Sequence, residues 1–577
     1  MRLSGSRILA AVTFVAFFGV APAAPASEDE TKNATTHKHY AESEQAQQPS
    51  PTGQLAPRLQ KLGPHTFRVS TRSKQAQTFM SQALNLTYGF NHAEAGRSFR
   101  EAARLDPSCA MAYWGQALVL GPNINALMTP EDEPKALALA LKAVSLKAKA
   151  SPRERALIEA VAERYSGKAD DRAARDKAYA AAMKKVAARY PDDLDIQTLY
   201  VESAMDLRPW NYWAPDGAPY EGTPEIATLT ESIMKRNPKH PGALHLYIHL
   251  MESNHPDKAV VAADTLRPLV PGAGHLVHMP SHIYQRVGRY ADAAETNLQA
   301  ASADEDYITQ CRAQGLYPMA YYPHNVHFVW FAATMDGRGQ LAVDSARKVA
   351  AKVSDPALKE LPLLAGFRVV PYYALTRFGR WDEMLAEPAP PADNLYLTGH
   401  WNYARGLAFL AKGQLYDAER ALVEVRRVAA DKSLEYPLFS PNTAANIFAI
   451  APLVLGGELC AARKEYDEAI AHLERAVRME DGLVYTEPSE WHYPPRHALA
   501  AVLLAAGRAR EAETVYWEDL RRNRENGWAL FGLAQALAAQ GKADQAALVR
   551  ARFEKAWARA DFKPTASRLL GPAPGDD

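Results

Sequence analysis

Cysteine is scarce in this chain: the 577 residues include only Cys109, Cys311 and Cys460, far apart and without a CxxC pair. That spacing excludes a zinc ribbon, a thioredoxin-like dithiol and a disulfide scaffold. An excess of charge of one sign is also missing, because Lys+Arg and Asp+Glu both number 66. Proteins that bind nucleic acids usually carry a basic excess. The charge balance therefore argues against a nucleic-acid partner.

Several motifs of enzyme chemistry are missing as well. No glycine-rich phosphate loop follows a strand-like segment and no G-x-S-x-G elbow is present, so neither a nucleotide cofactor nor a serine nucleophile is expected. Alternation of apolar and polar residues, the mark of half-buried strands, is nearly absent. Hydrophobic residues still make up 47% of the chain, enough for a large core. The sequence predicts an all-α fold.

The first residues have the features of an export signal. Arg2 and Arg7 precede an apolar run over residues 8–20, and small residues follow at 21–27. A basic start, a short apolar core and an A-x-A-like site indicate a cleavable signal peptide. The run is shorter than the roughly 20 residues of a membrane anchor, and no membrane span is expected downstream. We predict a signal peptide over 1–26 and a periplasmic or secreted protein.

The rest of the chain divides by composition. Residues 27–62 are polar, with few large apolar side chains, and cannot bury enough surface to offset the entropy of ordering. We expect a disordered linker there, a helical solenoid over 63–565 and a flexible tail over 566–577.

One pattern recurs within the helical part. A small residue is followed four positions later by a large apolar residue and seven positions later by another small or apolar one, so that all three share one helix face. The clearest copies are Ala95/Phe99/Ala102, Ala418/Leu422/Val425 and Ala469/Leu473/Ala476, and a looser copy is Ala293/Asn297/Ala300. Short turns with glycine or polar residues precede the copies, and another amphipathic helix precedes each turn. This helix–turn–helix unit resembles the tetratricopeptide repeat over most of residues 75–560.

The resemblance implies an architecture and a role. Such helix pairs stack into a superhelical solenoid because a single pair cannot bury its apolar face alone. In the family, the first helix of each pair lines a concave groove. The resemblance therefore implies a groove that binds a peptide, a protein or a small-molecule ligand.

Histidine is concentrated in the middle of the chain. Nine of the 17 histidines fall between His240 and His327, on three successive candidate first helices. Positions i, i+4 and i+7 of a helix span an arc of only about 60°. We therefore expect each helix to present its histidines on one face: His245, His249 and Glu252 on the first, His275, His278 and His282 on the second, unless Pro280 breaks it, and His324 and His327 on the third.

If the three helices are consecutive inner helices, these faces meet. Imidazole is the commonest transition-metal ligand, and mixed histidine and carboxylate sets suit zinc, copper or iron. The sequence predicts a metal site with enough ligands for two ions, made by His245, His249, Glu252, His275, His278, His282, His324 and His327. Two other interpretations remain open: histidines held by structural hydrogen bonds, and histidines that bind an anionic ligand.

Aromatic residues flank this region. The helical pattern lapses between Asp206 and Gly222, where Trp210, Tyr212 and Trp213 occur, and long irregular loops in compact folds are often functional. Tyr321 and Tyr322 directly precede Pro323 and His324. These five rings are candidates to line a ligand site beside the histidines, but packing between neighbouring repeats is the favoured interpretation for Trp210 and Trp213.

The leading hypothesis is an exported solenoid that binds a ligand in its groove and holds a transition metal at its centre. A second is a metalloenzyme, a hydrolase or a copper or iron oxidoreductase, in which Glu252 acts as general base. A third is a metal-free scaffold for protein partners.

Overall fold

A computed structural model describes residue 50 and residues 53–311, 317–438 and 441–570. The predicted signal peptide and most of the predicted linker lie outside the described residues. The described part is helical throughout, and its extended pairing is limited to three isolated bridges. The fold is a tetratricopeptide-like α-solenoid, as the sequence predicts.

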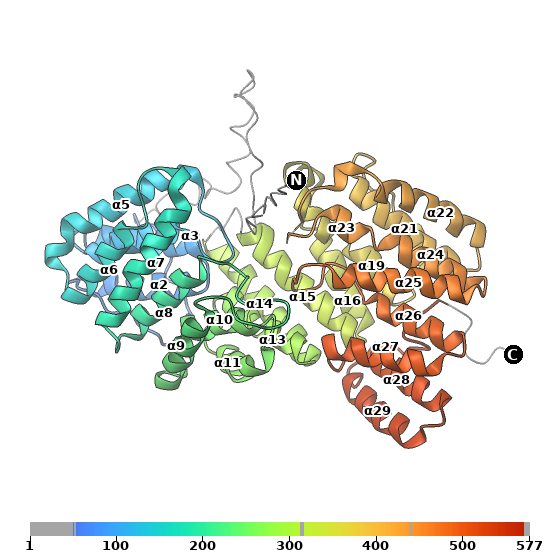
Figure 1. The fold of residues 1–577 in the computed structure, drawn as a ribbon. Helices are drawn as coiled ribbons and strands as arrows, with labels where there is room; N and C mark the ends of the chain where they lie inside the picture. Colours follow the sequence, from blue (N-terminus) through green and yellow to red (C-terminus); the bar gives the residue numbers. More distant parts are fainter. Residues whose placement is uncertain (1–49, 51–52, 312–316, 439–440, 571–577) are drawn as a thin grey trace, which may run out of the picture.

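The N-terminal helices form one lobe, on the left of Figure 1. They are α2 (Lys74–Tyr88), α3 (His92–Leu105), α4 (Ala110–Leu120), α5 (Glu133–Leu146), α6 (Pro152–Ala162), α7 (Arg172–Arg189), α8 (Leu194–Met205) and α9 (Thr223–Arg236).

The central helices join the two lobes and carry the histidines. They are α10 (Pro241–Met251), α11 (Val260–Leu266), α12 (Gly274–His278), α13 (Pro280–Arg286), α14 (Tyr290–Cys311), the π-helical turn η6 (Tyr317–Tyr321), α15 (Tyr322–Met335) and α16 (Gly339–Ala350).

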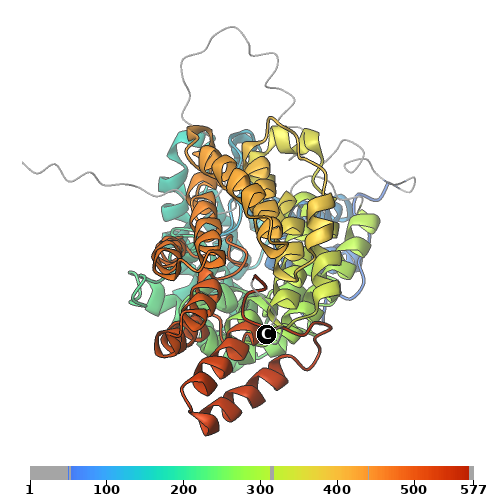
Figure 2. The same cartoon turned by 90° about the vertical axis from the view of Figure 1, so that its right-hand side faces the viewer.

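The C-terminal helices form the second lobe, which faces the viewer in Figure 2. They are α17 (Asp355–Glu360), α18 (Ala365–Arg368), α19 (Val370–Arg377), α20 (Trp381–Ala386), α21 (Leu395–Ala411), α22 (Leu415–Ala429), α23 (Ala444–Phe448), α24 (Ala451–Ala462), α25 (Tyr466–Asp481), α26 (Pro495–Ala505), α27 (Ala509–Arg522), α28 (Gly527–Ala539) and α29 (Ala543–Ala556).

The repeated small and large positions hold the helix pairs together. Ala95, Phe99 and Ala102 of α3 are fully buried. The Phe99 ring packs on the backbone of α4 at Gly115, where an added Cβ would lie 2.3 Å from the ring. Tyr516 of α27 packs in the same way on Gly532 of α28, 2.2 Å from an added Cβ. The pattern therefore marks close contacts between consecutive helices.

The solenoid also makes a long-range closing contact. Trp528 of α28 donates a hydrogen bond from its indole to the carbonyl of Thr334 in α15, at 2.8 Å. Arg524 pairs with Asp257 at 2.7 Å. Because these partners are far apart in sequence, the last helix pairs pack against the centre of the molecule rather than projecting from its end.

The ends of the folded part differ from the predicted boundaries. Ala56 and Leu62 are buried, and the backbone N–H of Leu59 donates to Gln82 at 2.9 Å. At the other end Ser567 is fully buried and bonds Tyr516 at 2.7 Å. The packed structure therefore includes residues that composition placed in the linker and in the tail.

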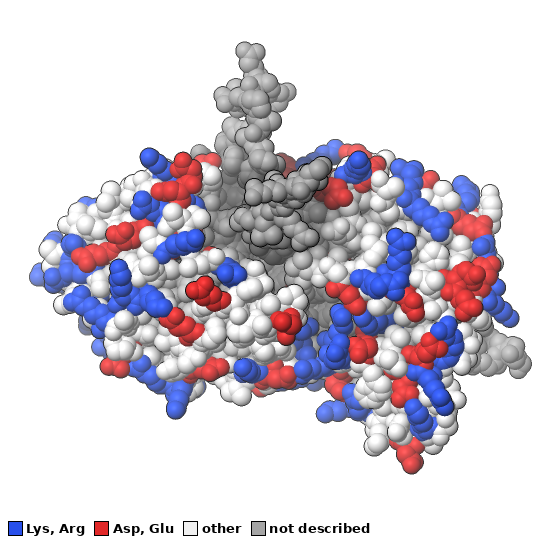
Figure 3. All heavy atoms as spheres, viewed as in Figure 1, with Lys and Arg blue, Asp and Glu red and all other residues white. Residues whose placement is uncertain are grey.

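One described segment, Ala444–Ala462, is long and apolar enough to cross a membrane. The surrounding helices bury 67% of its most apolar window, as expected of a core helix. Charged side chains of both signs are interspersed on the face in Figure 3, in keeping with the balanced composition.

Candidate metal centre

The central histidines form two adjacent triads. His245, His249 and His275 offer ligand atoms within 4.8 Å of one another, and so do His278, His282 and His324. We call these the first and the second triad. Their rings adjoin, because the centroids of His249 and His282 are 5.9 Å apart and those of His275 and His278 are 5.8 Å apart.

Three helical segments supply the triads, as predicted. The histidines of the second segment, however, do not all belong to one triad. The helix carrying His275 is interrupted at Met279 before Pro280, yet Met279 keeps helical backbone angles. His275 joins the histidines of α10, whereas His278 and His282 turn toward His324 of α15. One predicted face therefore serves both triads.

The distances between ring nitrogens suit shared metal ions. The Nε2 atoms of His245 and His275 are 3.1 Å apart, and those of His278 and His282 are 2.8 Å apart. Two nitrogens bound to one metal at about 2.0–2.1 Å, with coordination angles between about 90° and 110°, lie about 2.8–3.4 Å apart. Each pair is therefore placed as two ligands of one ion would be.

The outer nitrogens fix the tautomers. His245 Nδ1 lies 2.6 Å from the backbone carbonyl of Tyr88, and His278 Nδ1 lies 2.6 Å from Asn297 Oδ1. Asn297 Nδ2 donates to the carbonyl of Ala293, which sets the amide orientation. Because both outer partners only accept, Nδ1 carries the proton and Nε2 keeps its lone pair. Metal-bound histidines are normally oriented by such partners.

Burial keeps most of these imidazoles neutral. His245, His249, His275, His278 and His282 are at most 3% exposed. Burial, followed by the neighbouring histidines, holds the pKa of His245, His249, His275, His278 and His324 well below the usual range. Metal ions bind neutral imidazole. The same burial means that these histidines do not line an open groove, which differs from the arrangement that the repeat family implied.

Two carboxylates sit behind the triads. Glu252 lies 3.2 Å from His249 Nδ1 and 3.1 Å from His282 Nδ1, and Glu487 lies 2.6 Å from His282 Nδ1. Burial alone would lower the pKa of His282, but the two carboxylates raise it to about 10. Burial raises the pKa of Glu252 and brings that of Glu487 to about 7. The three groups therefore hold a proton that metal binding at His282 would release.

His327, predicted as a ligand, lies outside both triads. Its ring stacks on Trp330, with centroids 5.0 Å apart and planes within 8°, and burial lowers its pKa to about 3. His255, another histidine of this region, packs on Trp213 at 4.3 Å.

Only some of the aromatic residues predicted to bind a ligand contact the histidines. Trp210 and Tyr321 reach the first triad, because their ring centroids lie 5.0 Å from those of His249 and His275 respectively. Trp213 instead donates to the carbonyl of Leu250. Trp210 also donates to the carbonyl of Ile124, so both tryptophans bridge neighbouring repeats.

The two other predicted aromatic residues do not contact the histidines closely. Tyr322 donates to Glu305, and Lys348 and Lys352 lie over its ring. Tyr212 is buried, and its carbonyl accepts from the Thr223 hydroxyl.

Phe90 is a site residue that sequence reasoning missed. Its ring centroid lies 4.6 Å from that of His245, 5.4 Å from that of His275 and 6.0 Å from that of His249. Phe90 has φ 55°, a left-handed conformation that is strained for a bulky residue. Trp210 has φ 63°. Strained residues tend to cluster at functional sites, and these two aromatic walls of the first triad follow that rule.

A third group, His65, Asp195 and His240, is better explained by hydrogen bonding. The backbone N–H of Ala243 donates to His240 Nδ1, so the neutral ring carries its proton on Nε2, 3.3 Å from Asp195. That nitrogen has no free lone pair for a metal. Asp195 also accepts from Tyr88, whose carbonyl orients His245.

No protein-family model matches the chain, and no curated protein matches it. Solved structures similar over most of the chain include a human IFIT1 dimer with PPP-AAAA (12% identity, 84% of this chain, 91% of that chain, TM-score 0.31). Another is Ypp1, with 8% identity, 85% of this chain and 88% of that chain covered, and a TM-score of 0.39. A third is yeast Tom70, with 14% identity, 82% of this chain and 97% of that chain covered, and a TM-score of 0.30. Identities and scores this low transfer no ligand or partner.

Proposed function

We propose that this is an exported metalloprotein in which each histidine triad holds one transition-metal ion, making a buried centre of two metals. The observation that carries the proposal is the pair of short Nε2–Nε2 distances, 3.1 Å and 2.8 Å, in rings whose Nδ1 protons point outward to Tyr88 and Asn297. Two further ring nitrogens support the proposal: His249 Nε2 and His275 Nδ1 are buried without a hydrogen-bond partner among the described residues, and unpaired buried polar groups are costly.

Copper is the metal that we propose, from a donor set that suits zinc, iron and nickel as well. Each triad offers three imidazole nitrogens and no thiolate, and nitrogen sites of this kind favour Cu²⁺ over the other divalent first-row ions. Three protein ligands leave a coordination position for a small reactant, as in catalytic rather than structural sites. A bound copper pair would supply one-electron redox chemistry.

The surrounding residues restrict what reaches the metals. Phe90, Trp210 and Tyr321 wall the first triad, and Phe328 lies 4.9 Å from the ring of His282. These rings exclude bulk water and leave no room for a peptide at the histidines. Glu252 and Glu487 hold a proton beside His282. The arrangement favours an oxidoreductase for small molecules over a peptide-binding groove at this point.

The first experiment is elemental analysis of the untagged protein. We expect two metal equivalents in the wild type, one in His245→Ala/His249→Ala and one in His278→Ala/His324→Ala. His327→Ala is the matched control and should keep both ions, since its ring stacks on Trp330. Circular dichroism melts would show that each variant folds.

Other outcomes separate the alternatives. Zinc in place of copper would favour a hydrolase in which Glu252 acts as general base. Absence of metal from the folded wild type, even after reconstitution, would contradict the proposal and leave a scaffold that binds other partners.

A further inference from the structure

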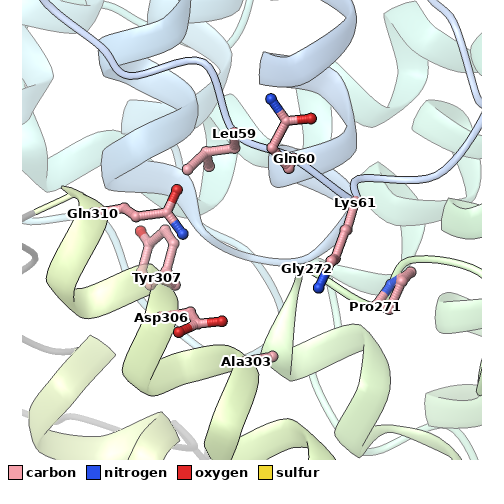
Figure 4. Close-up of a pocket in the computed structure, with 9 residues that line it drawn as sticks. All are labelled: Leu59, Gln60, Lys61, Pro271, Gly272, Ala303, Asp306, Tyr307 and Gln310. Carbon is pink, nitrogen blue, oxygen red and sulfur yellow. The ribbon is translucent and has the colours of Figure 1, made fainter.

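A surface cavity lies on the side of the centre where the N-terminal segment crosses α14. It has a volume of about 210 Å³. It is lined by Leu59, Gln60, Lys61, Pro271, Gly272, Ala303, Asp306, Tyr307 and Gln310 (Figure 4). The backbone N–H of Gly272 donates to the carbonyl of Lys61 at 2.9 Å, which joins the two walls. The lining offers an aromatic ring, two amides and one charge of each sign.

A row of tyrosines connects this cavity with the first triad. Tyr307 lines the cavity, and its ring centroid lies 5.0 Å from that of Tyr317. Tyr317 stacks on Tyr321 at 5.1 Å, and Tyr321 lies 5.0 Å from His275. Two of the three tyrosines belong to the π-helical turn, a distortion frequent at functional sites. Neighbouring ring centroids along the row are at most 5.1 Å apart, from Tyr307 to His275.

The middle tyrosine has a proton acceptor. The Tyr317 hydroxyl donates to Asp304 Oδ1 at 2.7 Å, and Asn325 donates to the other oxygen of the carboxylate at 2.6 Å. Asp304 is fully buried. An oxidised phenol must lose its proton, and the ionised form of Asp304, in contact with the Tyr317 hydroxyl, can accept it.

We propose that the cavity binds a small hydroquinone-type reductant and that Tyr307, Tyr317 and Tyr321 carry its electrons, one at a time, to copper at the first triad. This inference rests on the proposed function, since it needs a metal that changes its oxidation state. The cavity accommodates one aromatic ring against Tyr307, with Gln60, Lys61, Asp306 and Gln310 available to the hydroxyl groups.

The electrons and protons balance in each step. A copper ion held by His245, His249 and His275 would accept one electron from Tyr317 through Tyr321. The Tyr317 O–H bond breaks, and its proton moves to Asp304. The hydroquinone then gives one electron through Tyr307, and Asp304 returns the proton, which restores the phenol. Two such steps would turn the hydroquinone into a quinone and release its two protons to solvent from the cavity. Of the two electrons, one would stay at the first triad and the other would pass to the second triad, whose His278 ring lies 5.8 Å from that of His275.

The redox test uses stopped-flow reduction of the copper-loaded protein by hydroquinone without oxygen, after copper has been measured in every sample. Tyr317→Phe and Tyr307→Phe should lower the reduction rate at least tenfold with copper content unchanged. Tyr165→Phe is the control, because Tyr165 is also buried and bonded, 2.6 Å from the carbonyl of Ala117, but lies in the N-terminal lobe. Wild-type rates in both test variants would overturn the tyrosine route.

A second measurement needs no metal. Calorimetric titration of hydroquinone into the metal-free protein should show saturable binding that is lost in Ala303→Trp, which fills the cavity. Binding that persists in this variant would overturn the assignment of the cavity. Absence of any metal from the wild type would overturn both proposals, whereas zinc in place of copper, or copper with unaltered rates, would overturn only this one.

Discussion

The Nε2 atoms of His278 and His282 face each other at 2.8 Å, with Asn297 behind the first ring and Glu252 and Glu487 behind the second. An amide on one side and two carboxylates on the other give the two ligands different basicities. The second triad is therefore sensitive to Asn297, which is in none of the described groups of side chains that could hold a metal.

Replacement of Asn297 by leucine should weaken metal binding at the second triad alone. The change removes the acceptor for His278 Nδ1, and loss of such a partner typically costs about 10–100-fold in metal affinity. Competition with a chelator measures the two sites separately. Asn402→Leu is the control, because Asn402 makes the same bond to the carbonyl four residues earlier but lies in α21. Equal losses in the two variants would contradict the role of Asn297.

Substitutions of Phe90 should separate the contribution of its buried ring to stability from the cost of its strained backbone conformation. Phe90→Ala loses about 3–5 kcal/mol of stability through the lost burial. Phe90→Gly should be less destabilising than Phe90→Ala by about 1 kcal/mol, because glycine accepts φ 55° without strain. At Phe99, inside α3, the order should reverse by a similar amount. Urea unfolding tests both pairs, and the same order at the two positions would refute the strain at Phe90.

Gly274→Ala should disturb both triads at once. An added Cβ would lie 1.8 Å from Asp304 Oδ1 and 2.9 Å from the carbonyl of Ala300, so α12 must move away from α14. His275 and His278 move with it, and metal affinity should fall at both sites. Gly456→Ala in α24 has no neighbour of the new Cβ closer than 3.7 Å and should gain about 0.5–1 kcal/mol. Full metal content with unchanged affinity in Gly274→Ala would contradict the contact.

Asp304 should make the metal-free protein less stable as the pH rises. Burial raises its pKa to about 7, against the hydrogen bonds from Tyr317 and Asn325. Between pH 4 and 7 the folded carboxyl keeps a proton that the unfolded one has lost, so its contribution to the free energy of unfolding falls by on the order of 4 kcal/mol. Asp304→Asn should remove this part of the pH dependence.

Asp519→Asn should change the pH dependence of the free energy of unfolding in the opposite direction, and the same denaturation experiments test it. Burial raises the pKa of Asp519, but His497, Asn523 and Asn526 outweigh it and lower the pKa below the usual range. This variant should lose stability near pH 7, and the difference from the wild type should shrink in acid. A shared direction in the two variants would contradict the assignments.

The sequence predicted the helical repeats and most of the histidines that meet at the centre, because both are local patterns; that these histidines bind a metal stays a prediction. Ala95, Phe99 and Ala102 share a face by helical spacing, and so do His245 and His249. The three histidine-bearing helices were expected to lie side by side because they are consecutive in the solenoid. The predicted export of the chain stays a prediction, because its signal lies outside the described residues.

The missed residues depend on contacts that spacing does not encode. Glu487 reaches His282 from the loop between α25 and α26, far later in the chain. Phe90 reaches the first triad through a left-handed turn. Asn297 had a visible signal: it occupies the repeat position where Phe99 and Leu473 stand elsewhere. A polar residue at a buried repeat position indicates a partner, here His278.

The bond between Trp528 and Thr334 limits how this architecture can evolve. An open solenoid gains or loses helix pairs at its ends with little effect on the rest. Here an added pair between α15 and α28 would rotate the last helices about the superhelix axis and separate the two residues. Chains descended from this plan should therefore keep a constant number of helix pairs in that interval and vary in the length of their loops.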